Sequence, residues 1–145
     1  MNAPDFESKN EFSAIAKATD GNNNVSQKAI AISVNNLNDN FPVITSSNSI
    51  NMDEGETAVI TVNATDADDS SDPGFTNFSY TINGVDANFF SINGAGNIEF
   101  SSPSDFETQS NYSITVNVSD QLNITSQAIS ISLNDLNDEV PVFTS

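Results

Sequence analysis

The chain has 145 residues with 20 acidic and only three basic side chains, no His and no Cys, and its formal net charge is −17. Without Cys it has neither a disulfide framework nor a thiolate metal site, and its charge opposes binding to nucleic acid or to an anionic membrane. Hydrophobic residues form 37% of the chain, which is enough to build a folded core.

Alternation of apolar and polar residues predicts β-strands throughout the chain, and no segment has a helical period. The apolar positions Ile129, Ile131 and Leu133, like Val116 and Val118, fall on one face of their strands. Turn signals separate the strands, and Asn and Gly at 93–96 predict a β-hairpin. The expected strands lie near 11–19 and 25–35, and at 48–52, 57–65, 78–83, 88–92, 97–100, 112–120 and 127–135.

The sequence repeats itself after about 100 residues. Residues 5–7 and 105–107 both read DFE, at a spacing of 100, whereas 35–46 matches 134–145 at a spacing of 99. A one-residue slip is therefore expected between these motifs, near Gln127.

This repeat predicts how the chain is divided. Residues 1–43 are expected to be the C-terminal strands and linker of one unit, and 44–145 a complete unit with the start of the next linker. Seven short strands with regular turns indicate a sandwich. We predict an all-β fold, a seven-stranded Greek-key β-sandwich preceded by a partial repeat.

The carboxylates are unbalanced by cations over most of the chain. The basic residues are Lys9, Lys17 and Lys28, so the chain from residue 29 onward carries many carboxylates but no cationic side chain. Two interpretations stay open: the charges spread over a soluble acidic surface, or a hard divalent cation with oxygen ligands neutralises them.

Acidic residues gather at expected strand ends and linkers rather than being scattered. Any one cluster is explained by the preference of Asp and Asn for turns, but two clusters recur at the period of the repeat, beside Pro42 and Pro141. That recurrence favours cation binding. The clusters are Asp5 with Glu7, Asp105 with Glu107, Asn38 to Asn40, Asn137 to Glu139, Asp66 with Asp68, and the strand-ending Asp20 and Asp120.

In these motifs the chain resembles the cadherin repeat, over nearly its whole length. The matching motifs are MDEGE with Glu54, ATDAD with Asp66 and Asp68, DFE at 105–107, VSD with Asp120, and DLNDEVPVF at 135–143. The Asn-, Ser- and Thr-rich composition is similar to that of bacterial surface proteins with cadherin-like repeats.

The resemblance implies calcium ions at the junctions between successive repeats. The implied ligands at the internal junction are Asp5, Glu7, Asn38, Asp39, Asn40, Asp66, Asp68 and Asp120. At the C-terminal end, half a junction is implied, with Glu54, Asp105, Glu107, Asp135, Asn137 and Asp138.

Departures from the family pattern limit these expectations. Asn36 replaces the first Asp of the linker, which removes one charge and predicts weaker calcium binding. Phe6 and Phe106 replace the Arg of the Asp-Arg-Glu motif, and the chain has no Trp, so the Trp-anchored strand exchange of vertebrate adhesive cadherins is not expected.

The resemblance implies an extracellular, cell-surface location and a calcium-stiffened spacer in a repetitive adhesin. The alternative is a calcium-dependent polysaccharide-binding module. Such a module would need exposed aromatic rings, usually of Trp or Tyr, and this chain has no Trp and only two Tyr residues, Tyr80 and Tyr112. Neighbouring repeats are the expected partners, and homophilic association is a third possibility. An enzyme is not expected, because the chain has no His, Cys or Arg.

The leading fragment is too short to bury a core of its own. Because residues 5–42 closely match 105–141, one hypothesis is that the fragment replaces 105–141 in the sandwich, which would give a strand-exchanged dimer. The alternative is a poorly packed tail.

Overall fold

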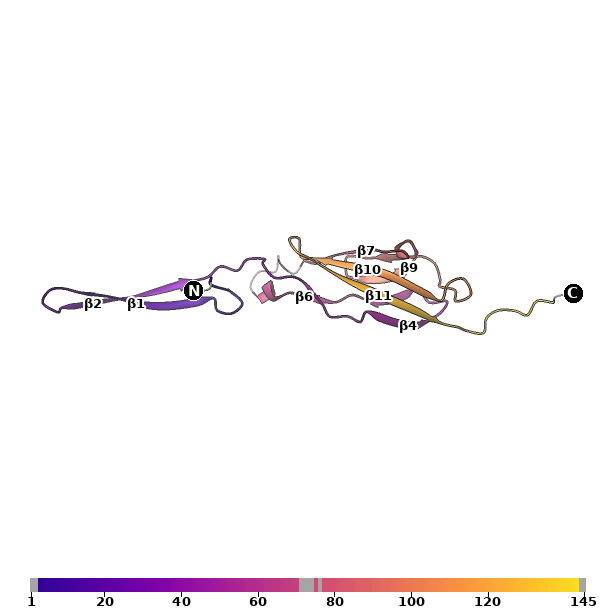
Figure 1. Ribbon diagram of the computed structural model, residues 1–145, viewed down its shortest axis with the longest axis horizontal. Coiled ribbons are helices and arrows are strands. Elements are labelled where there is room, and N and C mark those ends of the chain that lie inside the picture. The colour runs from indigo at the N-terminus through magenta and orange to yellow at the C-terminus, as the bar shows by residue number, and fades with distance from the viewer. Residues whose placement is uncertain (1–2, 71–74, 76, 144–145) are drawn as a thin grey trace.

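The computed structural model describes residues 3–70, 75 and 77–143. A two-stranded hairpin extends from one end of a sandwich, and the chain leaves the sandwich at the opposite end (Figure 1). In the described part no helix has the length and hydropathy that a membrane crossing would require. The strands are β1 (Glu11–Thr19), β2 (Val25–Ser33), β3 (Val43–Ile44), β4 (Ser49–Asp53), β5 (Ala58–Thr61), β6 (Ala64–Thr65), β7 (Ser79–Asn83), β8 (Phe90–Ile92), β9 (Asn97–Phe100), β10 (Asn111–Ser119) and β11 (Ile124–Asn134), with the 3₁₀ helices η1 (Ala67–Ser70) and η2 (Ala87–Phe89).

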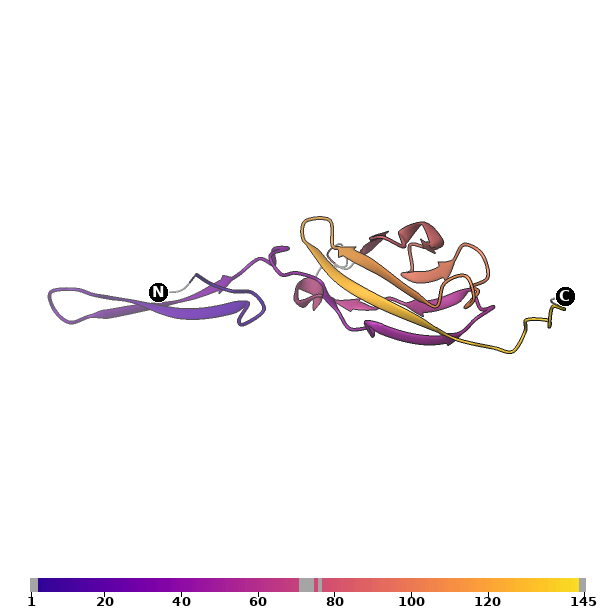
Figure 2. The same cartoon turned by 45° about the vertical axis from the view of Figure 1, so that its right-hand side comes forward.

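Two main sheets form the sandwich (Figure 2). One has the strand order β4-β11-β10-β7 and the other β5-β9-β8, while β3 pairs with β6. β4 runs parallel to β11, with Ile50 opposite Ile131, and the other pairings are antiparallel. The predicted all-β sandwich is confirmed. Its core comprises Met52, Val62, Phe90, Ile98, Phe100, Tyr112, Ile114, Val116, Val118, Ile129, Ile131 and Leu133.

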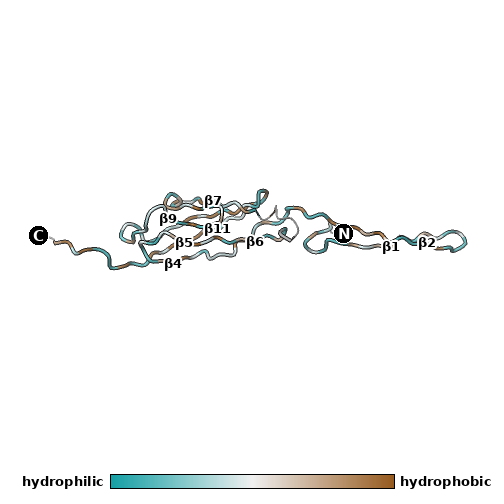
Figure 3. Tube along the Cα trace, turned by 180° about the vertical axis from the view of Figure 1, so that it is seen from behind, coloured by the Kyte–Doolittle hydropathy of each residue, from teal (hydrophilic) through white to brown (hydrophobic). Residues whose placement is uncertain are grey.

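The core confirms the period-two prediction for the last two strands. The inward positions of β10 are buried, as are those of β11 from Ile129 to Leu133, whereas outward positions such as Ser113 and Ser130 are exposed. Figure 3 shows hydrophilic and hydrophobic residues following one another along the strands. The predicted hairpin at 93–96 is also present, since Asn93 N–H donates to the Asn97 carbonyl at 3.1 Å between β8 and β9.

The strand expected at 57–65 is divided into β5 and β6. The register with β9 shifts between Ala58 and Ile60, and buried Val62 lies between the two strands. β5 pairs with β9, whereas β6 pairs with β3. A chain that passes from one sheet to another must interrupt its ladder there, so alternation alone predicted one strand where the structure has two. The short strand β3 was not predicted either. The first part of the strand expected at 88–92 is likewise a 3₁₀ turn, η2.

The hairpin β1–β2 repeats the pairing of β10–β11. Phe12 lies opposite Ile32, as Tyr112 lies opposite Ile131. The loop of the first hairpin has five residues (20–24) and that of the second has four (120–123). The slip expected near Gln127 therefore lies in this loop, where a length change leaves both strand registers intact.

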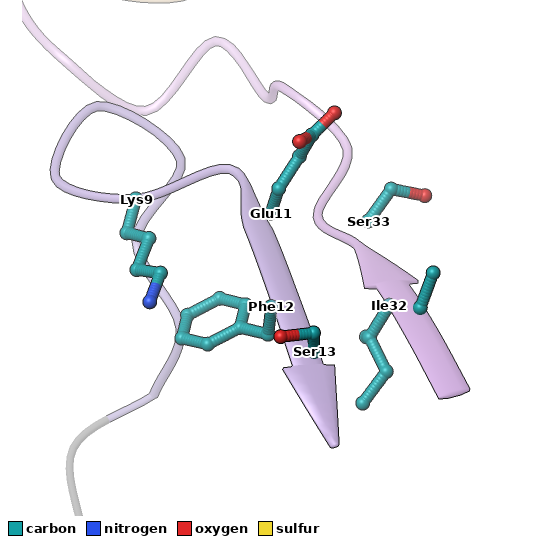
Figure 4. A pocket seen from close by; sticks show the side chains of 7 residues that line it. Lys9, Glu11, Phe12, Ser13, Ile32 and Ser33 are labelled. Carbon is teal, nitrogen blue, oxygen red and sulfur yellow. The ribbon is translucent and has the colours of Figure 1, made fainter. Parts of the chain in front are cut away.

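The apolar face of the hairpin lacks the cover that its counterpart has. All residues of β1 and β2 are exposed, because no second sheet packs on them within the described chain. Phe12 and Ile32 line an open pocket at the linker end of the hairpin, with the Lys9 ammonium 4.8 Å from the Phe12 ring centroid (Figure 4).

Candidate metal centre at the linker

The linker after β2 is held against the sandwich at the start of η1. Asn36 Nδ2 donates to the main-chain carbonyl of Asp68 at 2.8 Å. Asn40 donates to both carboxylate oxygens of Asp68, which is fully buried. The Asp-x-Asp segment that follows β6 therefore turns inward, and its second carboxylate faces the linker.

The loop between β10 and β11 provides a second buried carboxylate beside the linker. Asp120 is 1% exposed, and its Oδ1 accepts hydrogen bonds from the main-chain N–H groups of Leu122 and Asn123 at 2.8 and 2.6 Å. Burial raises the pKa of Asp120, but these bonds to the charged form outweigh it and hold the pKa below its ordinary value. Asn38 Nδ2 donates to the Asp120 carbonyl at 3.3 Å.

Carboxylates from three parts of the chain converge here. Glu7 precedes the hairpin, Asp39 is in the linker and Asp68 is in η1, and one oxygen of each lies within 4.8 Å of the others. Desolvation is the largest cause of a raised pKa for Glu7, and the charges of Asp68 and Asp39 add to it. The group is electrostatically strained without a positive charge.

Asp66 combines burial with a carboxylate oxygen that lacks a hydrogen-bond partner. It is 8% exposed, its Oδ1 accepts the Asp68 N–H at 3.0 Å, and its buried Oδ2 has no hydrogen-bond partner. Burial first, and then the charges of Asp68 and Asp120, raise the pKa of Asp66. A buried carboxylate oxygen without a donor is costly unless something positive approaches it.

The donor set at the linker fits calcium. It consists of carboxylate, amide and main-chain oxygens without nitrogen or sulfur ligands, and calcium takes six to eight such oxygens. Asp5 is placed differently from the other expected ligands: its carboxylate accepts bonds from Ser8 Oγ and the Glu7 N–H within its own turn. The Ser8 hydrogen bond is the main cause that lowers the pKa of Asp5.

A second acidic group lies where the chain leaves the sandwich. Glu54, Glu107 and Asp135 each bring a carboxylate oxygen within 4.8 Å of the others, and so do Glu107, Asp138 and Glu139. Glu54 is 5% exposed, and its two oxygens accept the N–H groups of Phe106 at 2.7 Å and Leu136 at 2.6 Å.

The two other ligands expected at this end, Asp105 and Asn137, are not among these converging carboxylates. Asp105 accepts bonds from Thr108 in its own turn, as Asp5 does from Ser8, and Asn137 is exposed.

Two residues at these sites were not among the ligands that the resemblance implied. Glu139 belongs to the second acidic group, and Asn123 lies between Asp120 and the linker. A signal for Asn123 exists in the repeat, since Asn24 follows Asp20 in the equivalent loop and donates to its carboxylate at 2.8 Å.

Comparison with known proteins identifies similar chains. Residues 48–134 match the family model of the cadherin domain, which is 87 of the 145 residues. Mouse cadherin-related family member 2 is 38% identical over 81 residues, 55% of this chain and 6% of that protein. Chicken cadherin-5 is 33% identical over 152 aligned positions, 96% of this chain and 19% of that protein. The chain thus spans less than a fifth of either relative.

A solved structure of the protocadherin gammaB4 extracellular domain has a similar fold. It superposes with a TM-score of 0.83 and 26% sequence identity, over 99% of this chain and 24% of that one. The superposition includes the hairpin and linker as well as the sandwich, because it leaves almost none of this chain uncovered.

Proposed function

Because this chain belongs to the cadherin family, we propose that it is a calcium-binding extracellular repeat that stiffens the joint to its neighbour in an adhesion protein. The observation that carries the proposal is the convergence of Glu7, Asp39 and Asp68 within 4.8 Å. These three residues come from the segment before the hairpin, from the linker and from the sandwich, so one ion bound to them would tie all three segments together.

The chain's own residues prepare this site. Asn40 and Asn36 hold the linker on Asp68, and the loop N–H groups hold the Asp120 carboxylate charged. Asp66 keeps an oxygen without a donor. Calcium, when bound, would supply the positive charge that cancels the repulsion among these groups.

The proposed division of the chain follows from the site. Residues 1–43 act as the end of one repeat and its linker, and 44–145 as the next repeat with the start of a further linker. Glu54, Glu107, Asp135 and Asp138 then form the ligands that this repeat offers to its successor, which would bring its own Asp-x-Asp segment. An extracellular location, as in the cadherin relatives, accords with this role.

The alternative, polysaccharide binding, has weaker support. Tyr112 is buried in an aromatic cluster with Phe90 and Phe100, and Tyr80 is half-buried. Neither ring is open to stack on a sugar face. The spacer is therefore the better proposal, with recognition located elsewhere in a longer protein, and we propose no catalytic role.

Strand exchange by the hairpin is opposed by side-chain volume. The registers of the two hairpins place Ala14 and Ala16 where Ile114 and Val116 fill the core. Loss of one buried Ile side chain to Ala typically costs about 2–5 kcal/mol. The hairpin would thus be a poor substitute for β10 and β11, and we expect a monomer, which sedimentation equilibrium tests directly.

Calcium titration of the full chain tests the proposed function. We expect calorimetric binding, and a melting temperature that rises between EDTA and millimolar calcium by mass action. Asp39→Asn should reduce both effects, whereas Glu99→Gln, at an exposed position of β9, should not. The same melting temperature in EDTA and in calcium would count against the proposal.

Stiffening has its own measurement. The chain has no Cys, and a Cβ added at Gly21 or Gly94 meets nothing within 4 Å, so spin labels on Gly21→Cys and Gly94→Cys can report the distance between hairpin and sandwich. Calcium should narrow that distance distribution. An unchanged width would show that calcium binds without stiffening the joint.

A further inference from the structure

The side-chain amide of Asn123 lies at the point where oxygens of the linker and of the β10–β11 loop converge. Its Nδ2 is 3.0 Å from Asn38 Oδ1 and 2.6 Å from the Asn40 carbonyl oxygen. The same nitrogen is 3.3 Å from Asp120 Oδ2. All three neighbours are acceptors, so the nitrogen end of the amide, with its partial positive charge, is the end that fits there.

We propose that Asn123 is an internal substitute for a cation: its amide clamps the linker onto the sandwich without metal and competes with calcium for these three oxygens. The proposal deepens the function proposed above and rests on it for the calcium arm. Calcium–oxygen distances are about 2.3–2.6 Å, so an ion coordinated by all three oxygens could not share their centre with the nitrogen. The Asn123 side chain would have to rotate away first.

The loop itself positions this amide, independently of the linker. In the first hairpin, Asn24 Nδ2 donates to Asp20 Oδ2 at 2.8 Å, and the Asn24 N–H donates to Oδ1 at 2.8 Å. That loop lies at the far end of the hairpin (Figure 1), with no linker beside it. The Asp–Asn pair is thus a local property of the loop, and at Asn123 the linker oxygens are added to it.

The amide also explains how Asp120 and the linker remain together while negatively charged groups gather around them. An amide donates two N–H groups, so three acceptors share them, and one bond must be bifurcated or weak. The 3.3 Å contact to Asp120 Oδ2 is the longest of the three. A full positive charge would satisfy the same oxygens better, which is why calcium can displace the amide.

The consequence is a joint with two separable parts. The linker stays docked on the sandwich when calcium is removed, because Asn123 adds its bonds to those that Asn36, Asn38 and Asn40 make to the sandwich. The segment carrying Glu7, by contrast, loses its only proposed tie to Asp39 and Asp68. Asp66 Oδ2 has no hydrogen-bond donor, so an incoming ion would meet no competing amide at that oxygen.

Variants of Asn123 in the full chain test the proposal. Asn123→Ala removes the donor, and Asn123→Asp removes it while keeping the size of the side chain. In EDTA, both should melt at a lower temperature than the wild type, because the hydrogen bonds from Asn123 to the linker are lost. In calcium titrations, Asn123→Ala should bind about tenfold more tightly at the position vacated by the amide, or with one more equivalent, since competing hydrogen bonds are gone. Asn24→Ala, the equivalent change in the first loop, is the control and should leave calcium binding unchanged.

The outcomes separate this proposal from the proposed function. If the wild type binds calcium and Asn123→Ala binds it with the same affinity and stoichiometry, the competition is overturned although the function stands. If neither binds calcium, the proposed function fails, and the clamp is then judged by the EDTA melts, where equal melting temperatures for the wild type, Asn123→Ala and Asn123→Asp overturn it.

Discussion

Asn40 donates two hydrogen bonds to the carboxylate of Asp68, from its main-chain N–H to Oδ2 at 2.9 Å and from its Nδ2 to Oδ1 at 2.7 Å. The two residues are 28 positions apart, and both oxygens of a fully buried carboxylate are satisfied by one linker residue. The path of the linker is therefore set by the sandwich that follows it rather than by the hairpin before it.

The buried carboxylate of Asp66 predicts a pH dependence in calcium-free solution. Its pKa is raised above the ordinary 3.8 by burial and by nearby negative charges, so the folded state holds this proton more tightly than the unfolded state. The contribution of Asp66 to stability is greatest below its unfolded pKa and is lost as the pH rises through the raised folded pKa. Asp66→Asn cannot ionise and should escape that loss.

Melting curves in EDTA from about pH 4 upward measure this effect. The melting temperature of Asp66→Asn, relative to the wild type, should increase with pH, and the variant should show a smaller rise on calcium addition. Glu99→Gln provides the comparison for loss of one exposed carboxylate. Parallel pH curves for the wild type and Asp66→Asn would contradict the prediction.

Replacing Glu54 in the C-terminal acidic group should lower the free energy of unfolding even without calcium. Its carboxylate accepts the N–H groups of Phe106 and Leu136, and Glu54→Ala leaves both without that acceptor. A hydrogen bond to a charged group typically contributes about 1.5–3 kcal/mol. Urea unfolding in EDTA should show this loss for Glu54→Ala and little change for Glu56→Ala, an exposed neighbour. Equal midpoints for the two variants would refute a structural role for Glu54.

Equivalent positions in the two hairpins should respond differently to the same substitution. Ile129 is fully buried, whereas Ile30, at the matching register position, is 41% exposed. Ile129→Ala should cost about 2–5 kcal/mol of unfolding free energy. Ile30→Ala should stay near the surface value of about 0.5 kcal/mol. Chemical denaturation measures both, and a large effect at Ile30 would mean that its face is covered in solution.

The two glycines in the turn between β8 and β9 should differ in how much stability is lost when each is replaced by Ala. Gly96 has φ +80°, and a Cβ there would lie 2.5 Å from the Val62 carbonyl oxygen, whereas a Cβ at Gly94 meets nothing within 4 Å. Gly96→Ala must therefore shift main chain at the point where β5 passes to β6, and it should lower the melting temperature clearly. Gly94→Ala should leave it nearly unchanged. A Gly96→Ala protein as stable as the Gly94→Ala protein would show that this contact relaxes freely.

Some features of the site could be predicted because they are carried by local pattern. The inward positions of β10 and β11 follow from alternation, since side chains change face at each residue. The recurrence of acidic motifs beside Pro42 and Pro141 indicated where oxygen ligands gather, and Glu7, Asp39 and Asp68 do come together in space.

Other features depend on contacts that no local pattern encodes. The division at Val62 arises because the chain changes sheets, and the burial of Glu54 depends on N–H groups 52 and 82 residues away. Asn123 looks like one more turn residue in the sequence, and its role follows from linker oxygens 83 and 85 positions distant.

The sequence alone determined the strand-forming segments, the repeat and the chemical identity of the oxygen donors, because period and spacing act over a few residues. Only the tertiary structure decided which donors share a centre, which carboxylate oxygen lacks a partner and which amide lies between them. Those relationships depend on how sheet registers and loop lengths close on one another, and a single donor displaced by one residue would point elsewhere.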